Sequence, residues 1–229
     1  MIEDPPLLTV RRDFARPDES ALRLLRNTPT GFLVDCMRGR GALDHRIKPL
    51  APDNCRFAAP VVTCHPGPGD NLAVFAALEI ARPGDVIFAA TDAFAGTCVA
   101  GDILMAMARN RRVAGFVTDG LVRDIEGILP VGLPVFCAGV TPNSCSRNGP
   151  GTAGLPVVMG GARVDAGDVA VGDRDGVVVV PRERVDEVCR QLPDVRRAEE
   201  ELTRRVRLGL DNIDSVRELM ASSRVRYVD

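Results

Sequence analysis

Strand-like apolar segments alternate with helix-like segments from residue 18 to residue 140, and this alternation restricts the fold more than any other feature. An alternating order of strands and helices is typical of α/β folds, in which helices cover the faces of a sheet. The predicted strands of this part cover residues 57–64, 85–91, 113–118 and 134–140. The predicted helices cover about 18–40, 101–110 and 124–129. A further predicted helix is capped by Asp70 and continues to Leu78.

The second part of the chain has a different pattern. Glycines and turn residues dominate residues 147–176, and Asp175-Gly176 predicts a hairpin turn. Short strands are expected at 156–159, 162–164, 168–172 and 176–180. A helix over about 183–192 should break at Pro193 and resume as a charged helix over about 194–208. Together the two parts predict an α/β fold with layers and a mixed sheet.

Composition predicts one domain that spans residues 1–229 and binds neither nucleic acid nor membrane. No low-complexity linker divides the chain, and 45% of its residues are hydrophobic. A net charge of −2 offers no basic face to nucleic acid, and no apolar run approaches the roughly 20 residues of a membrane span. The seven cysteines, an odd number without Cys-x-x-Cys spacing, together with the lack of an apolar leader, favour reduced thiols in a cytoplasmic protein.

Asp102, Arg123 and Asp124 are the residues that most strongly suggest chemistry. Asp102 follows Gly101 at the predicted start of a helix, and Arg123-Asp124 follows the strand at 113–118, so the side chains should converge at the ligand-binding edge of the sheet. A guanidinium grips a carboxylate or an enolate oxygen, and a carboxylate binds a hard metal ion. Unpaired amides near Ile103 and Leu104 could take a second anionic oxygen. Two structural alternatives remain open: Asp102 as a helix cap, and Arg123-Asp124 as a solvated turn.

Other motifs argue against competing chemistries. The glycines of 149–154 have dinucleotide-binding spacing but open no convincing helix, and those of 96–101 have phosphate-loop spacing with Asp102 where a lysine is required. Asp173-Arg174-Asp175-Gly176 lacks the distal glutamate of a calcium loop. Lys48, the sole lysine, lies in a polar stretch, so an aldolase that forms a Schiff base is disfavoured.

The set Asp102, Arg123 and Asp124 resembles the signature of class II pyruvate aldolases, which cleave 4-hydroxy-4-methyl-2-oxoglutarate and 4-carboxy-4-hydroxy-2-oxoadipate. The resemblance extends over about residues 30–210 and includes Gly69-Asp70-Asn71, Pro83-Gly84-Asp85-Val86-Ile87 and the stretch 169–181. RraA proteins, known as inhibitors of ribonuclease E, resemble these aldolases. The resemblance implies a swivelling β/β/α fold with mixed sheets, assembled as a homotrimer or homohexamer. Helices at 18–40 and 183–208 would pack on the domain or on a neighbouring subunit.

The same resemblance implies a metal-dependent retro-aldol reaction and oxaloacetate decarboxylation. Mg²⁺ or Mn²⁺ would be bound by Asp124, by Asp102 through water, and by Glu199 of a neighbouring subunit through water, with Glu200 as the substitute. Arg123 and Asp102 would be catalytic, while the substrate would contact Gly101, Ile103, Leu104 and Arg123. Selection of the C4 substituent is expected in loops that include Asn143, Ser144, Arg147 and Asn148. The alternative is an RraA-like, non-catalytic regulator that binds ribonuclease E or another protein.

Overall fold

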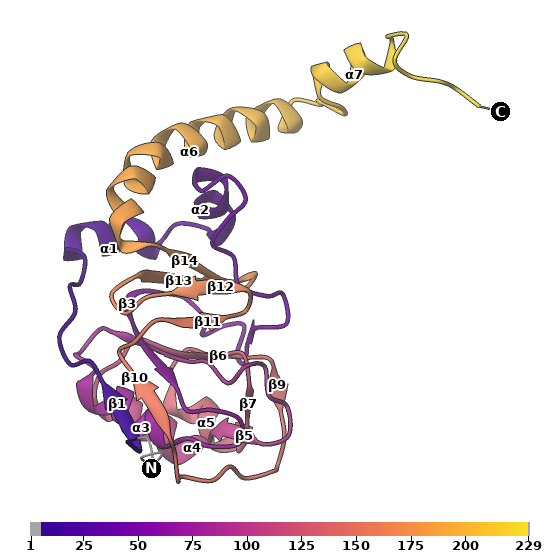
Figure 1. Cartoon of the computed structure of the whole chain (residues 1–229). Helices are drawn as coiled ribbons and strands as arrows, with labels where there is room; N and C mark the ends of the chain where they lie inside the picture. Colours follow the sequence, from indigo (N-terminus) through magenta and orange to yellow (C-terminus); the bar gives the residue numbers. More distant parts are fainter. Residues whose placement is uncertain (1–5, 229) are drawn as a thin grey trace, which may run out of the picture.

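A nine-stranded mixed sheet crosses the protein, whose computed structural model describes residues 6–228 (Figure 1). The long strand β3 is its centre, because it pairs in parallel with β4 and antiparallel with β10 and β13. All but its last residue are buried, as its apolar sequence predicts. The strands are β1 (Leu8–Val10), β2 (Lys48–Pro49), β3 (Phe57–His65), β4 (Val86–Ala89), β6 (Gly115–Thr118), β8 (Val135–Cys137), β10 (Gly151–Ala153), β13 (Val169–Asp173) and β14 (Gly176–Val180).

Two smaller sheets accompany the large one. β11 (Val157–Met159) and β12 (Ala162–Val164) form an antiparallel hairpin. β5 (Cys98–Ala100), β7 (Leu121–Val122) and β9 (Gly139–Val140) form a parallel sheet of three strands. The hairpin strands agree with the predicted strands at 156–159 and 162–164, whereas the strands of the parallel sheet have only two or three residues, too few to show a hydrophobic period. The sequence therefore missed the small parallel sheet, and it joined β8 and β9 into one predicted strand.

Helices cover the two ends of the layered structure (Figure 1). One group is α3 (Leu72–Ile80), α4 (Asp102–Asn110) and α5 (Ile125–Val131). The other is α1 (Glu19–Arg26), α2 (Thr30–Cys36), the 3-10 turn η1 (Arg182–Arg184) and α6 (Val185–Arg207), followed by α7 (Asp214–Met220). Separate hydrophobic clusters lie beneath the groups, and a third lies between the strand layers. The α/β layers with mixed sheets are thus confirmed. Within residues 6–228, no helix is long and apolar enough to cross a membrane.

The predicted break at Pro193 is wrong, because α6 runs without interruption through this residue. Proline removes one backbone hydrogen bond and usually ends or kinks a helix. Here Val188 and Leu192 before the proline are buried, Val195 after it packs against the same hydrophobic cluster, and α6 packs on α1 and α2, so tertiary contacts hold the helix on both sides of Pro193. Along this helix, Glu201 pairs with Arg204.

The hairpin between β13 and β14 is confirmed with a one-residue shift. Asp173 pairs with Gly176, so the two loop residues are Arg174 and Asp175 instead of the predicted Asp175-Gly176. Asp173 accepts hydrogen bonds from the amide and hydroxyl of Thr30, at 2.8 and 2.9 Å, which ties the start of α2 to the sheet. The Asp173 carboxylate therefore has a structural role, because it joins α2 to the hairpin.

Candidate active site

The candidate site lies where the three short parallel strands end. Asp102 begins α4 directly after β5 and Gly101, and Arg123-Asp124 follows β7. The loop after β9 completes the site and is joined to β5 by a 2.9 Å hydrogen bond from the Cys98 amide to the Asn143 carbonyl. Ligand sites of parallel sheets lie at the carboxyl ends of the strands. The expected convergence is present, but it occurs on the small sheet and not directly after the 113–118 strand.

A cavity of about 150 Å³ contains all six residues that the sequence assigned to the site of a single chain. They are Gly101, Asp102, Ile103, Leu104, Arg123 and Asp124. Its other lining residues come from β5, from α3 and its N-cap, and from the loop after β9: Asn71, Phe75, Cys98, Ala100, Ser144, Cys145 and Arg147. Of these, the sequence suggested Ser144 and Arg147 only as possible selectors of substrate. Asn71 was noted only as part of the family-like stretch Gly69-Asp70-Asn71, and Phe75 was not singled out, because a helical pattern does not reveal which neighbour faces a cavity.

Arg123 is held in place by two neighbours. Its Nε donates to Asp124 Oδ2 at 3.0 Å, and its Nη1 donates to the Ser144 hydroxyl. The side chains of Arg123 and Asp124 are 38% and 42% exposed, so both remain accessible from the cavity. Asp124 adopts a left-handed backbone conformation with φ of 60°, which turns the chain from β7 into α5. Arg123 is thus joined to the loop after β9, while Asp124 is exposed at the turn into α5.

Two glycines make room for the acidic side chains. A Cβ atom on Gly101 would lie 2.6 Å from Asp124 Oδ2, and one on Gly127 would lie 2.6 Å from Asp102 Oδ2. Both distances are far below van der Waals contact. Gly127 lies inside α5, where glycine is otherwise unfavourable, so close approach of α4 and α5 explains its presence. The presence of Gly127 within a predicted helix was the sequence signal that could have indicated this close approach.

Asp102 does not act as the N-cap of α4, because Gly101 occupies that position. Asp102 Oδ1 instead accepts a 2.7 Å hydrogen bond from the amide of Ile103. The expectation that the Ile103 amide is unpaired is therefore wrong. Asp102 Oδ2 faces Gly127 across the contact between α4 and α5.

The donor set of the cavity suits a hard divalent ion. Asp102 and Asp124 supply carboxylate oxygens, and Mg²⁺ or Mn²⁺ commonly binds through one or two carboxylates while retaining several waters. Among residues 6–228, no three or more His, Cys, Asp or Glu side chains are grouped so that they could hold a metal ion by themselves. Burial raises the pKa of the Cys145 thiol to about 11, with further contributions from Cys98, so Cys145 stays protonated and is a poor ligand at neutral pH.

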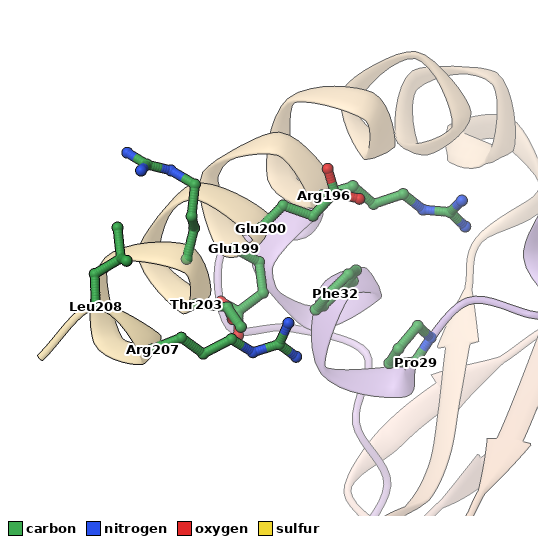
Figure 2. Close-up of a pocket in the computed structure, with 9 residues that line it drawn as sticks. Pro29, Phe32, Arg196, Glu199, Glu200, Thr203, Arg207 and Leu208 are labelled. Carbon is green, nitrogen blue, oxygen red and sulfur yellow. The ribbon is translucent and has the colours of Figure 1, made fainter.

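Glu199 and Glu200 belong to α6, which lies at the opposite end of the molecule from α4 and α5, whose N-terminal ends border this cavity (Figure 1). They face a separate groove of about 580 Å³ between α6 and α2, which Pro29 and Phe32 line from the α2 side (Figure 2). One subunit therefore does not bring either glutamate to Asp124, and their assignment to the site of a neighbouring subunit stays a prediction. Lys48 lies on β2 and donates to the carbonyl of Asp175, outside the cavity, which agrees with its rejection as a Schiff-base lysine.

Comparison with known proteins gives consistent matches. The model of the family described as RraA-like, Aldolase/RraA, matches residues 30–179. A protein of Halalkalibacterium halodurans, named provisionally as a 4-hydroxy-4-methyl-2-oxoglutarate aldolase, is 36% identical over 192 residues, covering 84% of this chain and 90% of that protein.

Solved structures of RraA proteins are also similar. RraAS2 of Streptomyces coelicolor, described as an unusual member of the RNase ES inhibitor RraA family, is 29% identical with a TM-score of 0.75 over 83% of this chain and 100% of its own. The RNA-processing inhibitor RraA of Thermus thermophilis is 28% identical with a TM-score of 0.62 over 68% and 93%. The family model covers more than half of the sequence, and the fold agrees with that of the solved RraA structures: this chain belongs to the RraA-like family.

Proposed function

We propose that this protein is a divalent-metal-dependent carbon–carbon lyase. Its substrates would be 4-hydroxy-2-oxo di- or tricarboxylic acids, such as 4-hydroxy-4-methyl-2-oxoglutarate or 4-carboxy-4-hydroxy-2-oxoadipate, which it would cleave to pyruvate and a second 2-oxo acid. The observation that carries the proposal is the meeting of Arg123, Asp124 and Asp102 in one cavity beside the N-terminus of α4. The name of the Halalkalibacterium relative supports the same reaction class.

Substrate binding follows from the groups that line the cavity. Asp124 would hold Mg²⁺ or Mn²⁺, with Asp102 and a neighbouring subunit's glutamate, Glu199 or Glu200, contributing through water. The bound ion would polarise the 2-oxo group of the substrate. The positive end of the α4 dipole, at Gly101 and Leu104, favours the adjacent carboxylate of the substrate. In this proposal the complete site exists only in a trimer or hexamer.

Cleavage then requires movement of one proton and one electron pair. A water oriented by Asp102 takes the proton of the C4 hydroxyl, the C3–C4 bond breaks, and C4 becomes the carbonyl of the departing 2-oxo acid. The electron pair of the broken bond remains on the pyruvate part as an enolate, whose oxygen Arg123 stabilises. Protonation at C3 gives pyruvate. Oxaloacetate would lose carbon dioxide to give the same enolate, so decarboxylation is an expected side activity.

Metal removal tests this proposal directly. Purified protein with Mg²⁺ or Mn²⁺ is expected to form pyruvate from oxaloacetate faster than the metal alone, and a chelator should abolish the difference because the ion polarises the keto group. A coupled lactate dehydrogenase assay measures the pyruvate. Restoration by added metal is the control against irreversible damage. Absence of turnover with either ion, on oxaloacetate and on both 4-hydroxy-2-oxo acids, would favour the alternative of an RraA-like regulator that binds ribonuclease E or another protein.

Substitution of Gly127 by alanine should separate activity from stability. The new Cβ would overlap the Asp102 carboxylate and displace it, so pyruvate formation should fall about 10- to 100-fold, the range typical of a misplaced catalytic group. Alanine is the better helix former by about 1 kcal/mol, which offsets part of the cost of the displacement. Turnover rate and thermal midpoint are measured on the same samples. Gly132→Ala offers a control, because its Cβ would meet nothing within 4 Å although φ of +70° adds some strain. Equal activity of the Gly127 variant and the unmodified protein would argue against a role of Asp102.

A further inference from the structure

Arg147 presents a second guanidinium to the cavity that contains Arg123. It belongs to the loop after β9, and its side chain lies over α3. The Cζ atom is 4.2 Å from the centre of the Phe75 ring, and Nε donates to Asn71 Oδ1 at 3.3 Å. Stacking on an aromatic ring leaves the outer nitrogen atoms of a guanidinium free to form in-plane hydrogen bonds.

The backbone on both sides of Arg147 is anchored by Asp70. The Asp70 carboxylate accepts hydrogen bonds from the Ser146 hydroxyl at 2.9 Å, the Asn148 amide at 2.6 Å and the Leu72 amide at 2.7 Å. Burial alone would raise the pKa of Asp70, but these donors outweigh it and lower the pKa below its usual value. The carboxylate is therefore ionised at neutral pH, and the loop holds Arg147 in a preset position, which reduces the entropy lost on binding.

The two arginines of the cavity differ in their partners. Arg123 is paired with Asp124, whereas Arg147 stacks on Phe75, donates a hydrogen bond to the neutral amide of Asn71 and has no ion pair among residues 6–228. Its charge is therefore not neutralised by a protein carboxylate. A guanidinium that is oriented but electrostatically unpaired suits a carboxylate of a ligand.

We propose that Arg147 binds the distal carboxylate of the substrate, the one farthest from the 2-oxo group, and so selects di- and tricarboxylic over monocarboxylic 2-oxo acids. This inference rests on the proposed function, in which Arg123 and the start of α4 bind the 2-oxo acid end. The distal carboxylate would otherwise lie in the cavity without a cation. Asn71 and Phe75 act as positioning residues, because they orient the guanidinium.

Binding of two ligands that lack a 4-hydroxyl group tests the proposal without requiring turnover. Pyruvate has one carboxylate, while 2-oxoglutarate adds a distal one, and calorimetric titration in the presence of Mg²⁺ gives both affinities. Arg147→Met keeps an unbranched apolar side chain on Phe75 but removes the charge. It should weaken 2-oxoglutarate binding about 10- to 100-fold, as expected for loss of a hydrogen-bonded ion pair, and pyruvate binding less than about threefold. Arg147→Lys should recover part of the loss. Arg163→Met, an exposed arginine on β12 outside the cavity, is the matched control.

The outcomes separate this inference from the lyase proposal. A selective loss for 2-oxoglutarate supports the role of Arg147 even if the 4-hydroxy-2-oxo acids are not cleaved, in which case only the lyase proposal fails. Equal weakening of both ligands, no change in either, or no binding of 2-oxoglutarate to the unmodified protein would overturn it. Where the protein is active, Arg147→Met should lower kcat/KM for 4-hydroxy-4-methyl-2-oxoglutarate about 10- to 100-fold. It should lower kcat/KM less than about threefold for 4-hydroxy-2-oxopentanoate, which has no distal carboxylate.

Discussion

Replacement of Arg123 by alanine is expected to reduce pyruvate formation from oxaloacetate by about a thousandfold or more, with little change in stability. The guanidinium stabilises the enolate oxygen, and loss of one preorganised donor to an oxyanion typically costs a factor of about 100 to 1000. Here the charge of the donor is lost as well, and Asp124 loses the partner that lies 3.0 Å from its Oδ2. The Arg123 side chain is partly exposed, so its removal leaves no large buried void. Single-turnover kinetics with saturating metal would measure the effect.

Arg123→Lys tests whether charge alone is sufficient. A lysine keeps the positive charge but cannot contact Asp124, Ser144 and an enolate oxygen with one planar fork, so recovery should be small. Folding is checked by circular dichroism and by the thermal midpoint of both variants. An alanine variant that retained more than about a tenth of the activity, a loss of less than about 1.4 kcal/mol in transition-state stabilisation, would exclude Arg123 as the group that stabilises the enolate.

Asp85→Ala should lower the free energy of unfolding by about 3–5 kcal/mol, the range for removing one partner of a buried ion pair. The Asp85 side chain is 2% exposed and that of Arg16 is 13% exposed. Arg16 donates from Nε to Oδ1 at 2.9 Å and from Nη2 to Oδ2 at 2.7 Å, and the Arg82 amide adds a 2.8 Å hydrogen bond. Without the Asp85 carboxylate, the Arg16 guanidinium and the Arg82 amide in the turn before β4 both lose their hydrogen-bond acceptor. Urea denaturation at a fixed protein concentration measures the change, because assembly would otherwise shift the midpoint.

An exposed pair provides the comparison. Asp53 pairs with Arg174, and their side chains are 93% and 68% exposed, so Asp53→Ala should change stability by less than about 1 kcal/mol. A similar small effect for Asp85→Ala would mean that the ion pair between Arg16 and Asp85 contributes little to the fold. The stretch Pro83-Gly84-Asp85 attracted notice in the sequence, and the buried contact to Arg16 gives it a structural reason.

Hydrophobic periodicity and helix signals were sufficient to locate most long elements. The strands near 57–64 and 176–180 and the helix at 101–110 were predicted within one or two residues, because continuous burial or a single apolar face leaves a pattern in the sequence. Local signals failed at Pro193, where packing of Leu192 and Val188 outweighs the preference of proline to end a helix. They also failed for β5, β7 and β9, which are too short to show a period.

The candidate site divides in the same way. The sequence alone determined which side chains carry charge and can bind an anion or a metal ion. Asp102, Arg123 and Asp124 could therefore be selected from their chemistry and from a family resemblance. Only the tertiary structure placed them after the neighbouring short strands β5 and β7 and added Arg147, stacked on Phe75 from a distant segment. The physical reason is that residue type and spacing along the chain are local properties. Contacts between segments tens of residues apart depend instead on how the sheets and helices pack, which no single segment specifies.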